Sequence, residues 1–398
     1  MAFAPMLDLE RIRRLQQLDV VGRRVFVRAD LDGSFSPHGA VRDDLPLVRL
    51  LPTLRYLISQ RAKVVVASRL TTAGREASRL AAKGLAERLA ELLGLPVRSL
   101  SPSFEGEVKG LAEGQVAMAP DLSIFPEEAQ HDEGWALRIG SAVDVYVLDG
   151  LKAARACGAS VAELPRLMCS CGVGFTIDPA LDMFHDAISA PAPEPYTFLL
   201  GGNSLRQVEP LIRAVLPLCQ NLLVGGAVAN TLLVAQGWQS GGSPHEPNEV
   251  TLAREVLELA RTLGVSVHTP LDAVIRGNAG TGSGYEEQAL DRALLPHEAA
   301  VDLGPETCSA YGQILARSAT VLWVGLLGDC SRPETQRGSI CVGQMAALAP
   351  RAMAAGDDTV NAIRDFRLDQ QFQTAAGGDA VLALFAGEVF PGFDALSR

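Results

Sequence analysis

The sequence lacks several features that would assign a chain of 398 residues to a simple class. Its longest apolar runs, such as Val321 to Leu327, are far shorter than the roughly 20 residues that span a bilayer. Met1 to Arg14 mixes acidic and basic residues and has no apolar segment typical of a secretory signal. The net charge is −11 and no Lys/Arg-rich run occurs, which argues against a nucleic acid partner. We therefore expect a cytoplasmic protein that binds neither membranes nor nucleic acids.

Metal-ligand patterns are also missing. The six histidines are scattered, without an HxxxH or HExxH pattern, and Cys169 and Cys171 form the only close pair among seven cysteines. An odd number of cysteines fits reduced thiols in a cytoplasmic chain. We expect no structural metal.

What the sequence does contain is a repeated pattern of strand, glycine pair and helix. Tyr196 to Leu200 is an apolar run that ends at Gly201 and Gly202, and apolar residues at helical spacing follow from Ser204 to Leu218. Asn221 to Val224 repeats the pattern with Gly225 and Gly226. Two such units in succession predict a doubly wound parallel sheet, in which ligands bind at the carboxyl ends of the strands.

The first half of the chain has its own series of β-α units. Predicted strands cover Arg24 to Asp30, Lys63 to Ser68, Val116 to Ile124 and Val143 to Leu148, and predicted helices cover Leu7 to Leu18, Arg49 to Ile58 with Asp44 as N-cap, Lys83 to Leu93 and Asp178 to Ala190. A proline-rich segment, 191–195, separates the two halves. We predict an N-terminal lobe over 1–190, a C-terminal lobe over 191–385 and a tail over 386–398 that returns to the N-terminal lobe.

The order of motifs resembles the phosphoglycerate kinase family over nearly the whole chain. Segments similar to family motifs are Arg24 to Asp32 ("RVLVRVDFN"), Val41 to Leu54 ("ITDDTRIRAALPTI"), Lys63 to Ala73 ("KVILMSHLGRP"), Val143 to Ser160 ("ADVYVNDAFGTAHRAHAS"), Leu200 to Gly202 ("LGGAKVSDK"), Gly225 to Gln236 ("GGGMANTFLKAQ"), Asp302 to Thr307 ("DIGPKT"), Val321 to Gly328 ("VVWNGPMG"), Asp357 to Thr359 ("GGDT") and Gly387 to Gly392 ("GKELPG"). The resemblance implies two doubly wound, Rossmann-like lobes joined by a hinge. It also implies phosphoryl transfer between Mg-ATP and 3-phosphoglycerate.

The resemblance also shows which family residues are missing on the carboxylate-substrate side. The family holds its anionic substrate with a ring of basic residues, and most positions of that ring are occupied here by other residues: Pro46, Thr72, Ser123 and Ala156. Asp30 matches outright, Arg69 stands where the family has histidine, and Arg155 lies one place before the family arginine. Arg49 lies one helical turn beyond Pro46. Asp30, Arg49, Arg69 and Arg155 are therefore the candidate substrate-binding residues.

The nucleotide lobe departs from the family as well. The two lysines of "GGAKVSDK" fall on Ser204 and Val208, so no catalytic residue is assigned, and Arg206 is the possible substitute. Asp379 replaces a glycine that faces the transferred group, and Ser331 replaces the glutamate that holds the ribose. The features that persist for binding Mg-ATP or Mg-ADP are Gly201, Gly202, Gly225, Gly226, Asn230, Gly325, Gly328, Asp358 and Thr359. Asp358 would hold Mg²⁺ through the nucleotide.

Three functions remain open from the sequence. The first is a family member impaired in or inactive for the family reaction, with residual nucleotide binding. The second is an ATP-dependent carboxylate kinase that forms an acyl phosphate on another small acid, using the new arginines. The third is a functional phosphoglycerate kinase with a rebuilt site. The glycines and Asp358–Thr359 also have a purely structural interpretation, as tight turns and helix caps.

Overall fold

The computed structural model describes residues 11–33, 35–36, 38–70, 74–189, 191–277 and 284–397. The chain forms two compact units, Met1–Leu181 with Val389–Arg398, and Asp182–Glu388. The division lies inside helix α8 (Asp178–Phe184), which continues as the π-helix η5 (His185–Ser189), whereas the sequence placed it at 190. The proline-rich segment belongs to the second unit, where the Thr320 hydroxyl donates to the carbonyl of Pro193 at 2.7 Å.

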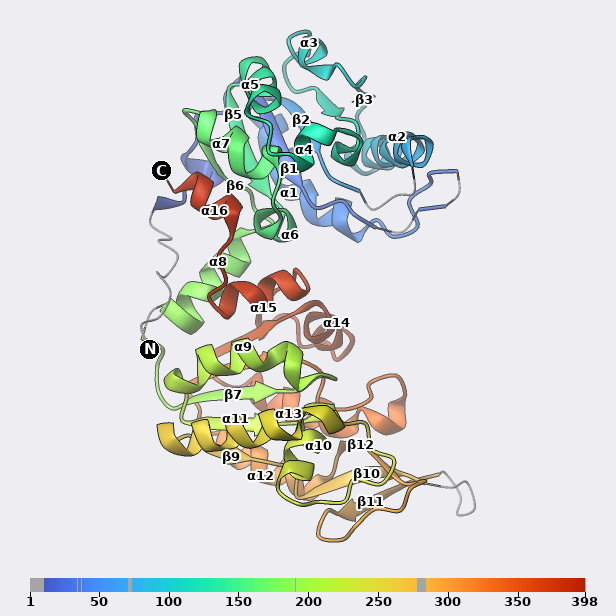
Figure 1. Ribbon diagram of the computed structural model, residues 1–398, viewed down its shortest axis with the longest axis vertical. Helices are drawn as coiled ribbons and strands as arrows, with labels where there is room; N and C mark the ends of the chain where they lie inside the picture. The colour runs from blue at the N-terminus through green and yellow to red at the C-terminus, as the bar shows by residue number, and fades with distance from the viewer. Residues whose placement is uncertain are drawn as a thin grey trace. The chain divides into compact units, whose positions relative to one another are not determined.

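The first unit is built on a six-stranded parallel sheet in the order β3-β4-β2-β1-β5-β6 (Figure 1). Its strands are β1 (Arg24–Ala29), β2 (Lys63–Ala67), β3 (Val97–Ser99), β4 (Val116–Met118), β5 (Val145–Asp149) and β6 (Cys171–Val173). Its helices are η2 (Leu15–Gln17), α1 (Leu45–Ser59), α2 (Arg75–Leu93), α3 (Phe104–Val108), η3 (Leu122–Ile124), α4 (Pro126–Ala129), α5 (Glu133–Ala142), α6 (Leu151–Arg155), η4 (Ala159–Glu163), α7 (Leu164–Leu167) and α16 (Pro391–Leu396).

Apolar side chains point to both faces of the sheet along β1, so the sheet is covered on both faces. Val25 and Val27 join the apolar cluster formed with α1 and α2, while Phe26 points the other way and stacks on Tyr146 with ring centroids 6.0 Å apart. The C-terminal helix α16 belongs to this unit, where Gly392 packs closely against Ala154 of α6.

The second unit contains a second six-stranded parallel sheet, in the order β15-β14-β13-β7-β8-β9, and a three-stranded antiparallel sheet, β11-β10-β12. The strands are β7 (Tyr196–Leu200), β8 (Asn221–Val224), β9 (Ser266–His268), β10 (Asp272–Arg276), β11 (Tyr285–Ala289), β12 (Ala299–Leu303), β13 (Thr320–Val324), β14 (Arg351–Ala355) and β15 (Gln373–Ala375). The helices are α9 (Leu205–Val215), η6 (Leu216–Leu218), α10 (Gly226–Ala235), η7 (Pro247–Glu249), α11 (Val250–Leu263), α12 (Pro305–Leu315), η8 (Pro333–Thr335), α13 (Arg337–Ala346), α14 (Asp357–Asp365) and α15 (Asp379–Phe385). The prediction of two parallel-sheet α/β lobes is confirmed.

Three local predictions from the sequence are wrong. The described part of the predicted helix over Leu7 to Leu18 contains no α-helix, only 3-10 turns at Arg11 and in the short η2 segment. The predicted strand over Val116 to Ile124 stops at Met118, because Asp121 turns the chain by accepting from the backbone N–H of Ser123 at 2.9 Å. Asp44 does not cap α1 with its side chain; it pairs with Arg88 at 2.6 Å instead.

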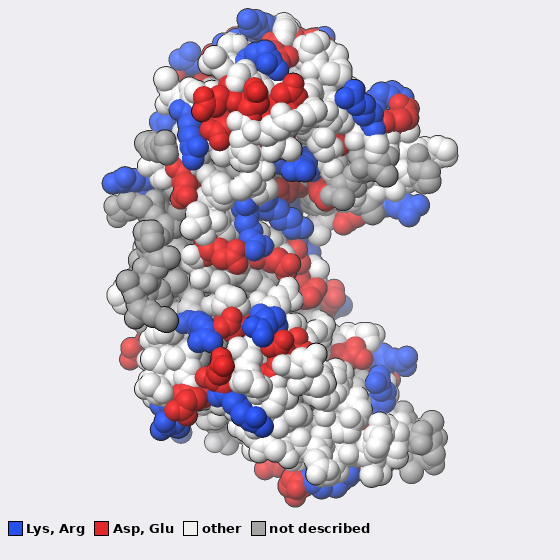
Figure 2. Space-filling view, in the orientation of Figure 1, with Lys and Arg blue, Asp and Glu red and all other residues white. Residues whose placement is uncertain are grey.

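Charged side chains are distributed over both units. On the face drawn in Figure 2, acidic side chains lie among the basic ones in each unit. Of the helices formed by the described residues, none is both long and apolar enough to cross a membrane.

Candidate functional site

The loops that follow β7, β8 and β13 pack against one another through their glycines. The N–H of Gly202 donates to the carbonyl of Leu326 at 2.7 Å, and the N–H of Gly226 donates to that of Leu327 at 2.7 Å. A Cβ at Gly201 would overlap the Leu326 carbonyl, and Gly226 has a φ of +62°. These turns therefore require glycine whether or not a ligand is bound.

A pocket of about 520 Å³ opens beside these loops in the second unit. Four of the predicted nucleotide-binding residues line it, namely Gly226, Asn230, Gly328 and Asp358. The others, Gly201, Gly202, Gly225, Gly325 and Thr359, are not among its lining residues. Thr359 is buried, and its hydroxyl accepts from the N–H of Gly325 at 2.7 Å, so it braces the glycine turn.

The described lining of this pocket carries more acidic than basic groups. Its charged residues are Asp302, Asp329, Asp358, Asp365 and Arg276. Burial raises the pKa of Asp302 to about 6, although its carboxylate accepts from Gly338 N–H at 2.7 Å and from the Ser339 hydroxyl at 2.8 Å. A hydrogen bond from Ser331 lowers the pKa of Asp329. A polyphosphate in this pocket would need a cation to offset the carboxylates.

The donor set suits a magnesium ion carried by a nucleotide. Mg²⁺ is usually held by one or two carboxylates together with phosphate oxygens and water. Asp358 lies in the first turn of α14, is exposed, and lines the pocket. Among the residues that the structure describes, no cluster of three or more His, Cys, Asp or Glu could hold a metal ion by itself. The groups that the structure describes therefore fit a magnesium ion carried by a nucleotide better than a metal bound by protein ligands alone.

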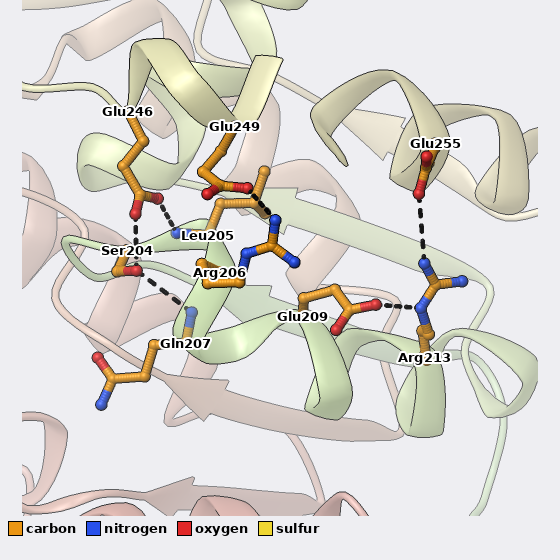
Figure 3. Close-up of polar contacts among 9 residues, drawn as sticks. All are labelled: Ser204, Leu205, Arg206, Gln207, Glu209, Arg213, Glu246, Glu249 and Glu255. Atoms are coloured by element: carbon orange, nitrogen blue, oxygen red, sulfur yellow. Dashed lines mark hydrogen bonds and ion pairs between the residues drawn. The ribbon is translucent and has the colours of Figure 1, made fainter. Parts of the chain in front are cut away.

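The N-terminus of α9 is occupied by a carboxylate of the chain itself (Figure 3). Ser204 is the N-cap: its hydroxyl accepts from the backbone N–H of Gln207 at 3.2 Å. The same hydroxyl donates to Glu246 at 2.8 Å, and Glu246 also accepts from the backbone N–H of Leu205. Negative charge is favoured at a helix N-terminus, so Glu246 stabilises α9 there. It also takes the donors that an incoming anion would use.

The other family lysine position, Val208, faces the core. Its side chain is 6% exposed, and the strongly amphipathic sequence of α9 places it with Leu205, Leu211 and Ile212 on the buried side. A cation cannot be added at this position without burying its charge.

Arg206, the proposed substitute for the lysines, is held by an acidic partner. Its guanidinium pairs with Glu249 at 2.6 Å and is 64% exposed (Figure 3). The Glu249 carboxylate raises the pKa of Arg206 further above its usual value. Gln207, in the first turn of α9, donates to Asp379 at 2.7 Å. The pairing of Arg206 gives no support to a rebuilt catalytic cation.

The candidate substrate residues of the first unit lie on separate elements. Asp30 caps α6, accepting from the N–H groups of Lys152 at 2.7 Å and Ala153 at 2.8 Å, and burial raises its pKa. Arg49 lies on α1, Arg69 follows β2 and is exposed, and Arg155 ends α6 and is exposed.

The remaining family positions of the first unit add no charge. Pro46 lies in the first turn of α1, Ser123 in η3 and Ala156 just after α6, while Thr72 lies outside the described residues.

Sequence reasoning missed Glu246 and Glu249. Both lie at η7, 41 and 43 residues from their partners on α9, in a segment with no periodic pattern. It also missed Asp302 as a pocket residue, although Asp302 is the first residue of the segment that resembles "DIGPKT".

Comparisons with known proteins agree with the fold and the order of motifs. The model of the family described as "Phosphoglycerate kinase" matches residues 15–388. The phosphoglycerate kinase of Desulfosudis oleivorans is 30% identical over 395 residues, covering 97% of this chain and 99% of that protein. The phosphoglycerate kinase of Thermomicrobium roseum is 31% identical over 390 residues, covering 96% of this chain and 98% of that protein.

A solved structure extends the likeness to three dimensions. The phosphoglycerate kinase of Coxiella burnetii superimposes with a TM-score of 0.85 at 23% identity, covering 97% of this chain and 98% of the other. A family match over nearly the whole length, together with relatives at 30% identity or more, identifies the ancestry. The chain belongs to the phosphoglycerate kinase family.

Proposed function

We propose that this member of the phosphoglycerate kinase family binds a magnesium nucleotide in the pocket of its second unit and is impaired in the family's phosphoryl transfer. Asp358 would hold the ion through the nucleotide phosphates, and Asn230 and Gly328 would line the bound nucleotide. The magnesium ion would neutralise charge on the phosphates.

The observation that carries the proposal is the state of the α9 N-terminus. Phosphoryl transfer depends on positioning and on neutralising the moving group, and loss of one such donor costs roughly a hundredfold to a thousandfold. The family lysine positions hold Ser204, which is bonded to Glu246, and the buried Val208. Two cations are thus replaced by neutral side chains with a carboxylate beside them, while Arg206 is paired with Glu249.

A coupled assay with 3-phosphoglycerate and Mg-ATP tests the catalytic part. We expect turnover at background. A rate within the roughly 1–100 s⁻¹ usual for kinases would overturn the proposal. A paired variant sharpens the assay: Ser204→Lys combined with Glu246→Gln restores one cation and removes the competing carboxylate, so any gain of turnover should appear there. The matched control is Glu255→Gln, on α11, whose carboxylate pairs with Arg213 at 3.6 Å.

Calorimetric titration with Mg-ADP tests the binding part. We expect measurable binding that is weakened by Asp358→Ala and by omission of magnesium. Asp369→Ala is the control, since Asp369 is exposed on the same unit and does not line the pocket. Absence of heat at millimolar nucleotide would refute nucleotide binding. An equal effect of the two substitutions would refute the role given to Asp358.

A further inference from the structure

A second pocket of the same unit, of about 620 Å³, is bounded by the small antiparallel sheet and by helices α12 and α13. Val274 of β10 and Tyr285 of β11 line one side, and Pro305 and Ser309 of α12 line the other. Leu303 is the only residue that it shares with the nucleotide pocket among the lining residues described.

Two thiols from different helices meet in this pocket. Cys308 on α12 and Cys341 on α13 both line it, and α12 packs on α13. Cys308 is buried in the apolar cluster of the unit, and Cys341 is half-buried and packs against that same cluster. Burial is the main cause that raises the pKa of Cys308 to about 12, and the neighbouring Cys341 thiol contributes.

The two thiols differ in access. Arg337, Cys341 and Met345 follow one another at four-residue spacing along α13, and all three line the pocket. Cys341 therefore stands on an open wall, one helical turn from a guanidinium. Cys308 is only 7% exposed, although it lines the same pocket. When a partly exposed thiol neighbours a buried one, the exposed thiol reacts first and the buried one resolves the mixed disulfide.

We propose that Cys341 and Cys308 form a thiol–disulfide exchange site for small aliphatic disulfides. The Cys341 thiolate attacks one sulfur of the small disulfide, forms a mixed disulfide and releases one small thiolate, which takes up a proton. The deprotonated Cys308 sulfur then attacks the Cys341 sulfur, forms the Cys308–Cys341 disulfide and releases the second small thiol. In sum, the protein dithiol loses two electrons and two protons, and the small disulfide is reduced to two thiols.

The burial of Cys308 determines the relative rates of these two steps. The buried Cys308 thiol is hard to ionise, so the second step is slower than the first. The mixed disulfide on Cys341 should therefore accumulate before it is replaced by the internal disulfide. This site does not depend on the nucleotide pocket, and its test does not depend on catalysis.

The experiment uses the full chain with the exposed Cys157 and Cys169 replaced by serine and bis(2-hydroxyethyl) disulfide as the oxidant. Tryptic peptides distinguish the relevant thiols, because Cys308 lies in 293–317, Cys341 in 338–351 and Cys330 in 318–337. We expect a transient adduct on 338–351, followed by a crosslink between 293–317 and 338–351 that a reductant reverses.

Two further variants decide the roles of the two sulfurs. Cys308→Ser should leave a stable adduct on Cys341 and no crosslink, and Cys341→Ser should leave both peptides unmodified in the folded protein. A crosslink that forms only after denaturation would overturn the proposal. So would an adduct on Cys341 that persists in the parent chain as long as in Cys308→Ser, or a crosslink through Cys330.

Discussion

Asp149, at the end of β5, is a fully buried carboxyl group whose ionisation should limit the stability of the first unit. Burial raises its pKa from 3.8 to about 6. Its Oδ1 accepts from the N–H of Thr176 at 2.8 Å, but Oδ2 is buried without a hydrogen-bond partner. The Thr176 hydroxyl is also buried and outside hydrogen-bond geometry, but it and the Thr53 hydroxyl lie close enough to the carboxyl to offset part of the rise in its pKa. We expect Asp149→Asn to stabilise the protein near neutral pH.

The sign and size of the effect follow from the proton balance. Between the unfolded pKa of 3.8 and the folded value of about 6, the folded state holds the proton more tightly than the unfolded state does. Stability therefore falls as pH rises through this window and stays lower above it. A shift of about two units corresponds to about 3 kcal/mol at neutral pH. Asparagine keeps the Oδ1 acceptor and carries no charge, and its Nδ2 can donate to the Thr176 hydroxyl.

Urea unfolding of the parent and the variant between about pH 4 and pH 7 provides the measurement, with amide exchange of β5 as a local readout of the first unit. The two proteins should converge at the acid end and differ by about 3 kcal/mol at the neutral end. Asp302→Asn is the control for the local readout. The pKa of Asp302 is also raised to about 6, but its carboxylate lies in the second unit and not beside β5. A variant that is less stable than the parent at neutral pH, or a difference that does not change with pH, would refute the reasoning.

Substitutions at three more positions test how buried groups pack. Glu128→Ala removes the buried carboxylate that accepts from the Ser160 N–H at 2.7 Å and from the Ser160 hydroxyl at 2.6 Å. We expect the free energy of unfolding in urea to fall by about 3 kcal/mol, and a fall below about 1 kcal/mol would contradict the importance of these hydrogen bonds. Val208→Lys buries a charge and should lower the thermal midpoint, whereas Val208→Ile should have little effect; equal midpoints would show that this position is not desolvated. Gly201→Ala should lower the free energy of unfolding of the second unit in urea by several kcal/mol, because the new Cβ would overlap the Leu326 carbonyl. An unchanged free energy of unfolding would mean that the loops after β7 and β13 separate easily.

How far the sequence predicts the site depends on the range of the interaction. The glycine pairs at 201–202 and 225–226 are local signals, and the structure places them in the expected turns at the ends of β7 and β8. Val208 could be identified as buried from helical periodicity alone. Asp358 could be placed at a helix start from its neighbours in sequence.

Other predictions failed because a distant residue competed for the group. Asp44 has the local pattern of an N-cap, yet Arg88 of α2 takes its carboxylate. For Arg206, whose role as a substitute for lysine stays a prediction, the sequence likewise gave no sign that Glu249 pairs with it across 43 residues. The antiparallel sheet β11-β10-β12 was not predicted either, since β11 is mostly exposed and polar and gives no clear alternating pattern.

The sequence by itself determined the family, the two parallel-sheet lobes and the presence of Ser204 and Val208 where the resemblance implies lysines, because residue identity and short-range periodicity carry that information. Only the tertiary structure decided what surrounds those positions. Glu246 reaches the α9 N-terminus, Asp302 lines the pocket beside the glycine loops, and Cys308 and Cys341 line a common pocket, because chain segments far apart in sequence are brought together when the sheets are covered. Contacts of this kind leave no local pattern in the sequence, so they cannot be predicted from it.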